Sequence, residues 1–345
     1  MKFSLVTGLV LVLALVMSIG TIGMADQASP RIALFVSTIN NPYFVTMANG
    51  AKAAAEELGA SITVFDGQND SSIQTKQVED AIAKGYSAIL LNSVDQAALV
   101  PVVKEANDAG IPVFSVDRDV KGGERVCYIG TSNVLAAQQG AATFLRDLAV
   151  TRFAKPTPWN IVILEGIPGA SAAVEREEGF KNVLQPFIDA GVIKVIADQT
   201  AQFDRATGLK VMEDILATTK DIDGLICAND EMALGALKAL KEASIPVGMA
   251  NNGVIIMGFD AEDDAVAAVK AGDLVGTVAQ APFIQGYWGT KAAVQYVQGT
   301  WTVPAGTQVY EPTGAKFIPT PVAIVTADNA DTITTLTLAK PALPR

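Results

Sequence analysis

Residues that could bind a small molecule follow the apolar runs of this sequence, most of them where a predicted strand gives way to a loop or a helix. In doubly wound α/β sheets, ligands bind in the crevice outside the carboxyl ends of the strands, because loops and helix N-termini converge there. We therefore treat these residues as one candidate ligand site. They are Ser37, Asn41, Tyr43, Phe44, Asp117, Arg118, Arg176, Phe203, Asn229, Asp260 and Gln280.

The residue types in this set favour binding over catalysis. Carboxylate and guanidinium groups are planar and can each bind two neighbouring hydroxyls, while aromatic rings can cover the C–H faces of a polyol ring. The chain contains no histidine, the commonest general base and a frequent metal ligand. Neither G-x-x-x-x-G-K-[ST] nor, after the first predicted strand, G-x-G-x-x-G is present. We therefore expect no catalytic residue, no metal and no cofactor.

Several of these residues have simpler structural interpretations. Asn229 and Asp260 could each cap the helix that follows. Asp117 and Arg118 could form an exposed ion pair that contributes little. Arg176 could pair with the neighbouring glutamates on a helix surface. Taken singly, none of these positions decides between a structural role and a ligand contact.

The segment Asn41-Pro42-Tyr43-Phe44 begins a predicted helix that runs to about Leu58. Asn41 is a suitable N-cap, and Pro42 suits the first helical position. Adjacent helical positions point about 100° apart, so at most one of the two aromatic rings fits a single apolar stripe. One or both rings could instead stack on a ligand.

Short β-rich runs alternate with amphipathic helical runs along the chain, which predicts two open, mostly parallel sheets with helices on both faces. A Pro-rich turn at 155–158 is interpreted as the loop into the sixth strand. The predicted strands are 31–37, 61–65, 88–92, 112–116 and 125–129 in the first half, and 160–164, 193–196, 224–227, 254–257 and 275–279 in the second.

The first 25 residues are typical of a cleaved secretory signal peptide, with Lys2, an apolar run and Gly23-Met24-Ala25 before the expected cleavage site. We therefore expect a periplasmic protein. The formal net charge of -11 and the absence of a basic run make nucleic acid an unlikely partner. Cys127 and Cys227 lie in apolar runs of different halves, which predicts two buried free thiols.

Several segments together resemble the type I periplasmic sugar-binding proteins of ABC importers, in unbroken order from about Arg31 to Gly299. The longest of them runs from Ala228-Asn229-Asp230-Glu231 to Leu237. The others are Val36-Ser37-Thr38, Asn40-Asn41-Pro42-Tyr43-Phe44, Val116-Asp117-Arg118, Ala172-Ala173-Val174-Glu175-Arg176, Gln202-Phe203-Asp204-Arg205, Gly258-Phe259-Asp260 and Ala279-Gln280.

The resemblance implies two doubly wound parallel-sheet lobes, joined by a three-segment hinge, that close over D-ribose or a related monosaccharide. It places the first lobe at 30–131 plus about 281–312, the second at 132–280 plus about 313–330, and a tail at 331–345. The crossings are expected near Thr131 and Gln280 and between Val309 and Thr320. The stretch 302–313 is expected to be a connector. The implied partners of the monomer are an inner-membrane permease and, further, a chemoreceptor.

Three alternatives to ribose binding were considered. A sugar-responsive repressor would need an N-terminal helix-turn-helix, where this chain has its apolar leader. A sugar-processing enzyme would need a spaced carboxylate pair, but Asp117 and Asp260 are expected in opposite lobes. The same fold could bind another pentose, a hexose, a polyol or a signalling furanose, because Tyr43 stands where the resemblance leads us to expect Phe.

Overall fold

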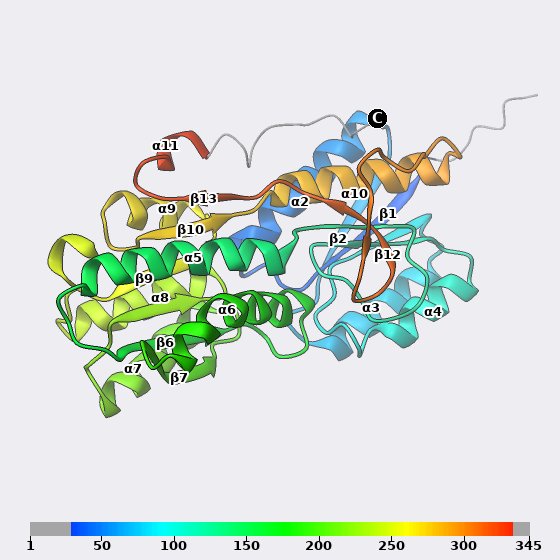
Figure 1. Ribbon diagram of the computed structural model, residues 1–345. Helices are drawn as coiled ribbons and strands as arrows, with labels where there is room; N and C mark the ends of the chain where they lie inside the picture. The colour runs from blue at the N-terminus through cyan, green and yellow to red at the C-terminus, as the bar shows by residue number, and fades with distance from the viewer. Residues whose placement is uncertain (1–28, 334–345) are drawn as a thin grey trace, which may run out of the picture.

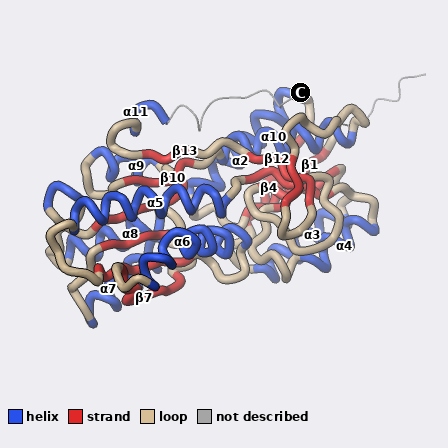
Figure 2. The backbone as a smooth tube through the Cα atoms, in the orientation of Figure 1, coloured by secondary structure: helices blue, strands red, loops and turns tan. Residues whose placement is uncertain are grey.

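We describe residues 29–333 of a computed structural model of the protein. The chain forms two lobes, each with a central sheet and helices on both faces (Figure 1). Figure 2 shows the strands inside each lobe and the helices outside them. The predicted fold class is therefore confirmed. The signal peptide expected at 1–25 lies outside the described residues, and no helix within 29–333 is long and apolar enough to cross a membrane.

The first lobe has a sheet of order β11-β12-β5-β4-β3-β1-β2, parallel except for the β11-β12 pair. Alternate residues of β1 face opposite sides, so that Leu34 and Phe35 belong to separate apolar clusters. The strands are β1 (Arg31–Val36), β2 (Ser61–Asp66), β3 (Ala88–Leu91), β4 (Val113–Val116), β5 (Tyr128–Gly130), β11 (Gln308–Tyr310) and β12 (Ala315–Pro319). The helices are α2 (Pro42–Glu57), α3 (Ser71–Ala83), α4 (Val100–Asp108) and α10 (Pro282–Val297).

The second lobe has a sheet of order β13-β10-β9-β8-β6-β7, parallel except for the β10-β13 pair. The strands are β6 (Trp159–Glu165), β7 (Ile193–Thr200), β8 (Gly224–Cys227), β9 (Ile255–Asp260), β10 (Gly276–Ala279) and β13 (Ala323–Val325). The helices are α5 (Asn133–Arg152), α6 (Ser171–Asp189), α7 (Arg205–Thr218), α8 (Asp230–Glu242), α9 (Asp263–Lys270) and α11 (Ala330–Ile333), with a 3-10 turn at Met249–Asn251.

Each of the ten predicted strands overlaps a strand of the structure, but the C-terminal part differs from the prediction. Strand β11 lies inside the stretch 302–313 that we expected to be a connector. Strand β12 pairs with β5 in the first sheet, with Phe317 opposite Tyr128. Residues 315–319 therefore belong to the first lobe, whereas we expected them in the second. These strands of three and five residues were missed because they lie between Gly- and Pro-containing turns and are too short to show a recognisable apolar period.

The chain passes between the two sheets three times. The first passage follows β5 at Thr131, and the second follows β10 at Gln280. The third lies between β12 and β13 and begins at Thr320. Three connecting segments of this kind form a hinge about which the two lobes can rotate.

Helices α2 and α10 lie side by side in the first lobe (Figure 1). Their close approach depends on glycine, because a Cβ on Gly50 would lie 2.0 Å from the carbonyl oxygen of Phe283, and one on Gly286 would lie 2.0 Å from that of Met47. Cys127 and Cys227 are free and buried, as predicted, and burial raises the pKa of the Cys127 thiol to about 12.

Candidate functional site

A small cavity lies between the lobes. Ten of the eleven predicted residues line it; Ser37 does not, and Ala172 was not predicted. The lining residues are Asn41, Tyr43, Phe44, Asp117, Arg118, Ala172, Arg176, Phe203, Asn229, Asp260 and Gln280.

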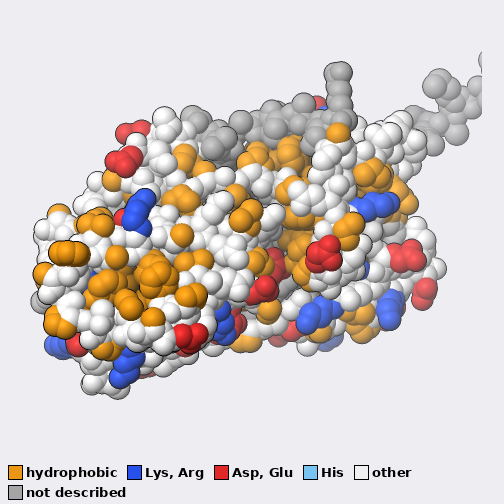
Figure 3. Space-filling view, in the orientation of Figure 1, with side chains coloured by type: hydrophobic (Ala, Val, Ile, Leu, Met, Phe, Trp, Pro, Cys, Tyr) orange, Lys and Arg blue, Asp and Glu red, His pale blue; other side chains and the backbone are white. Residues whose placement is uncertain are grey.

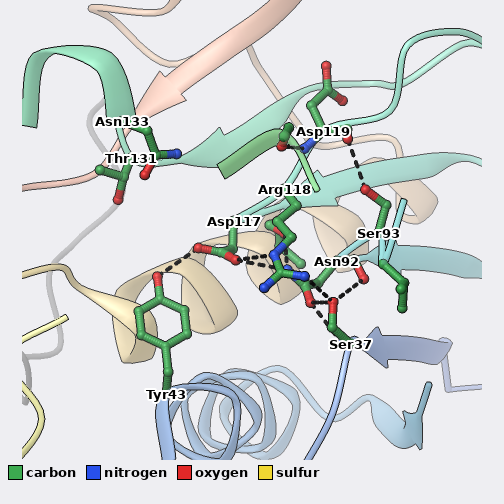
Figure 4. Close-up of polar contacts among 12 residues, drawn as sticks. Ser37, Tyr43, Asn92, Ser93, Asp117, Arg118, Asp119, Thr131 and Asn133 are labelled. Atoms are coloured by element: carbon green, nitrogen blue, oxygen red, sulfur yellow. Dashed lines mark hydrogen bonds and ion pairs between the residues drawn. The ribbon is translucent and has the colours of Figure 1, made fainter. Parts of the chain in front are cut away.

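Arg118, just after β4, presents its guanidinium between the two lobes. Its central carbon lies 5.3 Å from the ring centroid of Phe44 in the first lobe and 5.2 Å from that of Phe203 in the second. Its Nη1 donates to Ser37 Oγ at 2.9 Å (Figure 4). Within residues 29–333, its buried Nε has no hydrogen-bond partner, although Asp117 Oδ2 lies 3.7 Å away. A buried donor of this kind can bind an acceptor from outside the chain.

The side chain of Asp117 accepts hydrogen bonds from two residues of the first lobe. Its backbone has a φ of 62°, an uncommon conformation for a residue with a side chain. Its Oδ1 accepts from Tyr43 Oη at 2.9 Å and its Oδ2 from Asn92 Nδ2 at 2.9 Å (Figure 4). Burial raises the pKa of Asp117, while Arg118 and Arg176 oppose the rise.

Ser37 and Asn92 support the cavity from behind. Ser37 Oγ donates to Asn92 Oδ1 at 2.6 Å and accepts from Arg118. Asn92 thus links Ser37 to Asp117, and the sequence did carry a signal for it, since it ends the predicted strand 88–92. Ser37 therefore orients Arg118 instead of lining the cavity.

In the second lobe, Arg176 is fixed by several groups at once. Its Nη1 donates to the carbonyl oxygen of Ala228 at 2.7 Å and its Nε to Asn133 Oδ1 at 3.0 Å. Its guanidinium lies 3.8 Å from the ring centroid of Phe259 and 3.5 Å from Asp260 Oδ1. Arg176 is buried, so the helix-surface interpretation is wrong.

The sequence suggested that Asn229 and Asp260 could each cap the following helix, and only Asn229 does so. Asn229 does cap α8, because its Oδ1 accepts from Met232 N at 3.0 Å, and it also lines the cavity. Asp260 caps no helix: it ends β9 with a φ of 122°, a costly conformation for a residue other than glycine. Burial raises its pKa to about 8, against the opposing charge of Arg176.

Tyr43 and Phe44 both belong to the apolar core as well as to the cavity wall, with 4% of each residue exposed. The expectation that at most one fits the core was wrong, because the first turn of α2 is enclosed on more than one side. Their rings meet edge to face, with centroids 5.4 Å apart. The capping role of Asn41 is as expected, since its Oδ1 accepts from Tyr43 N at 2.7 Å.

The hydroxyl of Tyr43 reaches the three interlobe passages. It lies 2.8 Å from Gln285 Oε1 and 3.2 Å from Gln280 Oε1. Gln280 Oε1 accepts from Thr131 Oγ1 at 2.6 Å, and Gln285 Nε2 donates to Thr320 Oγ1 at 3.2 Å. One buried polar cluster therefore joins all three passages to the cavity. Gln285 was not predicted, because it lies inside an apolar helix rather than at a strand end.

The lobes touch each other around the cavity, so the structure is in a closed arrangement. Gln96 N donates to the carbonyl oxygen of Gly169 at 3.0 Å, and Asp119 N donates to Ser171 Oγ at 3.1 Å. Asp117 and Asp260 face the cavity from opposite lobes. Opening would separate these two halves of the site.

Two hinged α/β lobes that enclose a polar cavity with aromatic walls define a two-lobe receptor for a small molecule. The model of the periplasmic binding protein domain matches residues 32–300, and the chain belongs to this family.

Among curated proteins, the chain is 39% identical to the ribose import binding protein of Haemophilus influenzae over 265 residues, which cover 77% of this chain and 85% of the relative. It is 38% identical to the ribose import binding protein of Escherichia coli over 262 residues, 76% of this chain and 83% of the relative.

Solved structures show the same fold. The Caulobacter myo-inositol binding protein matches with a TM-score of 0.76 and 27% identity, over 92% of this chain and 100% of that chain. The binding protein of the arabinose ABC transporter from Shewanella sp. ANA-3 matches with a TM-score of 0.76 and 27% identity, over 89% and 95%.

Proposed function

We propose that this protein is the binding component of an ABC importer and that it captures D-ribose or a closely related monosaccharide in the cavity between its lobes. The Nε of Arg118 carries this proposal, because Arg118 lines the cavity and this buried, charged donor has no hydrogen-bond partner within residues 29–333. Carboxylates, amides and aromatic rings complete the surroundings that a hydroxylated ring requires. The ribose import binding proteins among the relatives support the choice of sugar.

The proposed mechanism is hinge closure without chemical change. Asp117 and Arg118 approach the sugar from the first lobe, and Arg176 and Asp260 approach it from the second. All four can contact one ligand only when the lobes are closed, so the sugar shifts the equilibrium by its differential affinity for the closed form. An inner-membrane permease then recognises that form.

The remaining parts of the proposal concern location and partners. A signal peptide directs the protein to the periplasm and is cleaved after Ala25. The mature protein acts as a monomer, and a chemoreceptor is a further partner of the closed form. Nucleic acid is not a partner: the sequence pI is about 4.6, and the basic side chains on the face in Figure 3 are scattered rather than gathered.

The direct test is isothermal titration of the mature protein, from Asp26 onward, with D-ribose. Bound sugar is first removed by mild unfolding and refolding. We expect one-to-one binding with a negative heat-capacity change, as apolar ring faces are buried. A protein that refolds but gives no heat with any monosaccharide would overturn the proposal.

A different monosaccharide is the second candidate, and Tyr43 favours it. Its hydroxyl meets three acceptor oxygens within 3.2 Å but can donate to only one of them. Asp117 and Gln280 line the cavity, so at this end it offers acceptors that could select a ligand hydroxyl that ribose lacks. A thermal-shift screen of pentoses, hexoses and myo-inositol separates the candidates, because a true ligand raises Tm with its concentration.

Ser37→Ala is expected to weaken sugar binding about fivefold. The change removes the acceptor that orients Arg118 Nη1 but no cavity-lining group. The effect is indirect, because Ser37 bonds to Arg118 and not to the ligand, and about 1 kcal/mol of lost binding free energy corresponds to that factor. Titration of the variant checks this, and a loss as large as that of an Arg118 variant would place Ser37 in direct contact with the ligand.

A further inference from the structure

A second bridge between the lobes lies outside the cavity. Tyr310, on β11 of the first lobe, donates its hydroxyl to Glu175 Oε1 on α6 of the second lobe. Only 9% of Tyr310 and 6% of Glu175 is exposed, although the two residues belong to different lobes. Neither residue lines the cavity. The closed arrangement thus buries a carboxyl group that does not line the cavity.

The bridge continues from Glu175 to a cavity residue. Asn133 Nδ2 donates to Glu175 Oε2 at 3.2 Å, and Asn133 Oδ1 accepts from Arg176 Nε at 3.0 Å. Asn133 is the first residue of α5, directly after the first interlobe passage. The chain Tyr310, Glu175, Asn133 and Arg176 therefore connects the edge of the first sheet to a cavity guanidinium in the second lobe.

The aromatic surroundings hold Tyr310 in place. Its ring packs against Tyr128 and Phe317, with centroids 4.9 and 5.4 Å away. Tyr128 in turn donates to the carbonyl oxygen of Asp117 at 2.8 Å. The same aromatic cluster thus supports a cavity residue of the first lobe and the bridge to the second.

We propose that Tyr310 and Glu175 form a latch that stabilises the closed form and positions Arg176 through Asn133, so that both residues strengthen ligand binding without touching the ligand. The inference rests on the proposed function, since it assigns two positioning residues to the same closure. Tyr310 belongs to the C-terminal hairpin β11-β12, which lies beyond the region 32–300 that the family model matches, whereas Glu175 lies within that region.

The latch also predicts a pH dependence. Burial raises the pKa of Glu175 to about 7, against the bonds from Tyr310 and Asn133 and the charge of Arg176. Opening hydrates the carboxyl group and returns its pKa toward about 4.3. A pKa that is higher in the closed form means that closure takes up a proton, so affinity falls as pH rises toward 7 and levels off above it. The titratable and charged groups facing the pair are Tyr128, Arg176, Asp117, Asp119 and Glu178.

Titration with the monosaccharide that binds the wild type tests the latch in three variants. Tyr310→Phe keeps the ring and is expected to bind about tenfold more weakly, as for the loss of one hydrogen bond to a buried carboxyl group. Glu175→Gln is expected to lose the part of the pH dependence between pH 5 and 7. Tyr287→Phe is the matched control, because Tyr287 donates to Glu57 at 2.5 Å within one lobe.

Affinity of Tyr310→Phe within twofold of the wild type, or an unchanged pH profile in Glu175→Gln, would overturn the latch. If the wild type bound no sugar, the proposed function would fail. Small-angle X-ray scattering of the free proteins would then test the latch independently of sugar binding. A wider distance distribution for Tyr310→Phe than for Tyr287→Phe supports it, and superimposable curves contradict it.

Discussion

Alanine in place of Arg118, Arg176 or Asp260 is expected to weaken sugar binding by about 100-fold in each case. These side chains are ionisable, buried and line the cavity, so each deletion removes strong hydrogen bonds to the ligand and leaves a partner group unpaired. A loss of about 2.7 kcal/mol, within the range for bonds to charged groups, corresponds to this factor. Isothermal titration of the three variants measures it.

Arg205→Ala provides the control for this series. Arg205 pairs with Glu231 and Asp264 and does not line the cavity, so its removal should leave affinity within twofold of the wild type. Circular dichroism and thermal melting establish that each variant is folded. Full affinity in all three folded cavity variants would show that the site assignment is wrong.

Asp223→Ala is expected to destabilise the second lobe by about 3 kcal/mol. Asp223 accepts from Arg152 Nε at 2.5 Å, from Lys155 Nζ at 2.8 Å and from Asn160 N at 2.8 Å. Arg152 and Asp223 are both buried, and removing one member of a buried ion pair leaves the other charge uncompensated. Urea unfolding followed by circular dichroism measures the loss.

The matched control is Asp221→Ala. Asp221 also pairs with Lys155, but its side chain is 69% exposed, so we expect a change below about 0.5 kcal/mol.

The pKa of Asp223 is lowered, because the bonds from Lys155, Asn160 and Arg152 outweigh the effect of burial. Its contribution is therefore full above about pH 4 and is lost as pH falls through its native pKa. An equal loss of unfolding free energy in Asp223→Ala and Asp221→Ala would contradict this account.

Much of the cavity could be predicted because its residues obey a local rule. Asp117, Asn229 and Asp260 each follow a buried apolar run, and parallel strands bring their carboxyl ends together. The same rule explains why Asn92 could have been recognised, since it ends such a run. Arg176 lies on a helix, and only the resemblance between segments placed it in the site.

Other parts depend on contacts that local sequence does not encode. Gln285 lies in the first turn of the apolar helix α10, and its role depends on three passages that meet only in the folded molecule. Tyr310 lies in a three-residue strand among turn residues, and such a strand is too short to show an alternating apolar pattern. The double role of Tyr43 and Phe44, in core and cavity wall, likewise depends on the helix packed beside them.

Because β12 lies near the C-terminal end of the described sequence, the parallel strands of the first sheet can be completed only after those of the second during synthesis. Every parallel strand of the second sheet has been synthesised by Ala279, whereas the first sheet gains β12 only at Ala315–Pro319. Until then β5 has an open edge, with backbone groups that could pair with another chain. A fragment that stops before residue 315 therefore carries a nearly complete second lobe and a first lobe prone to intermolecular strand pairing.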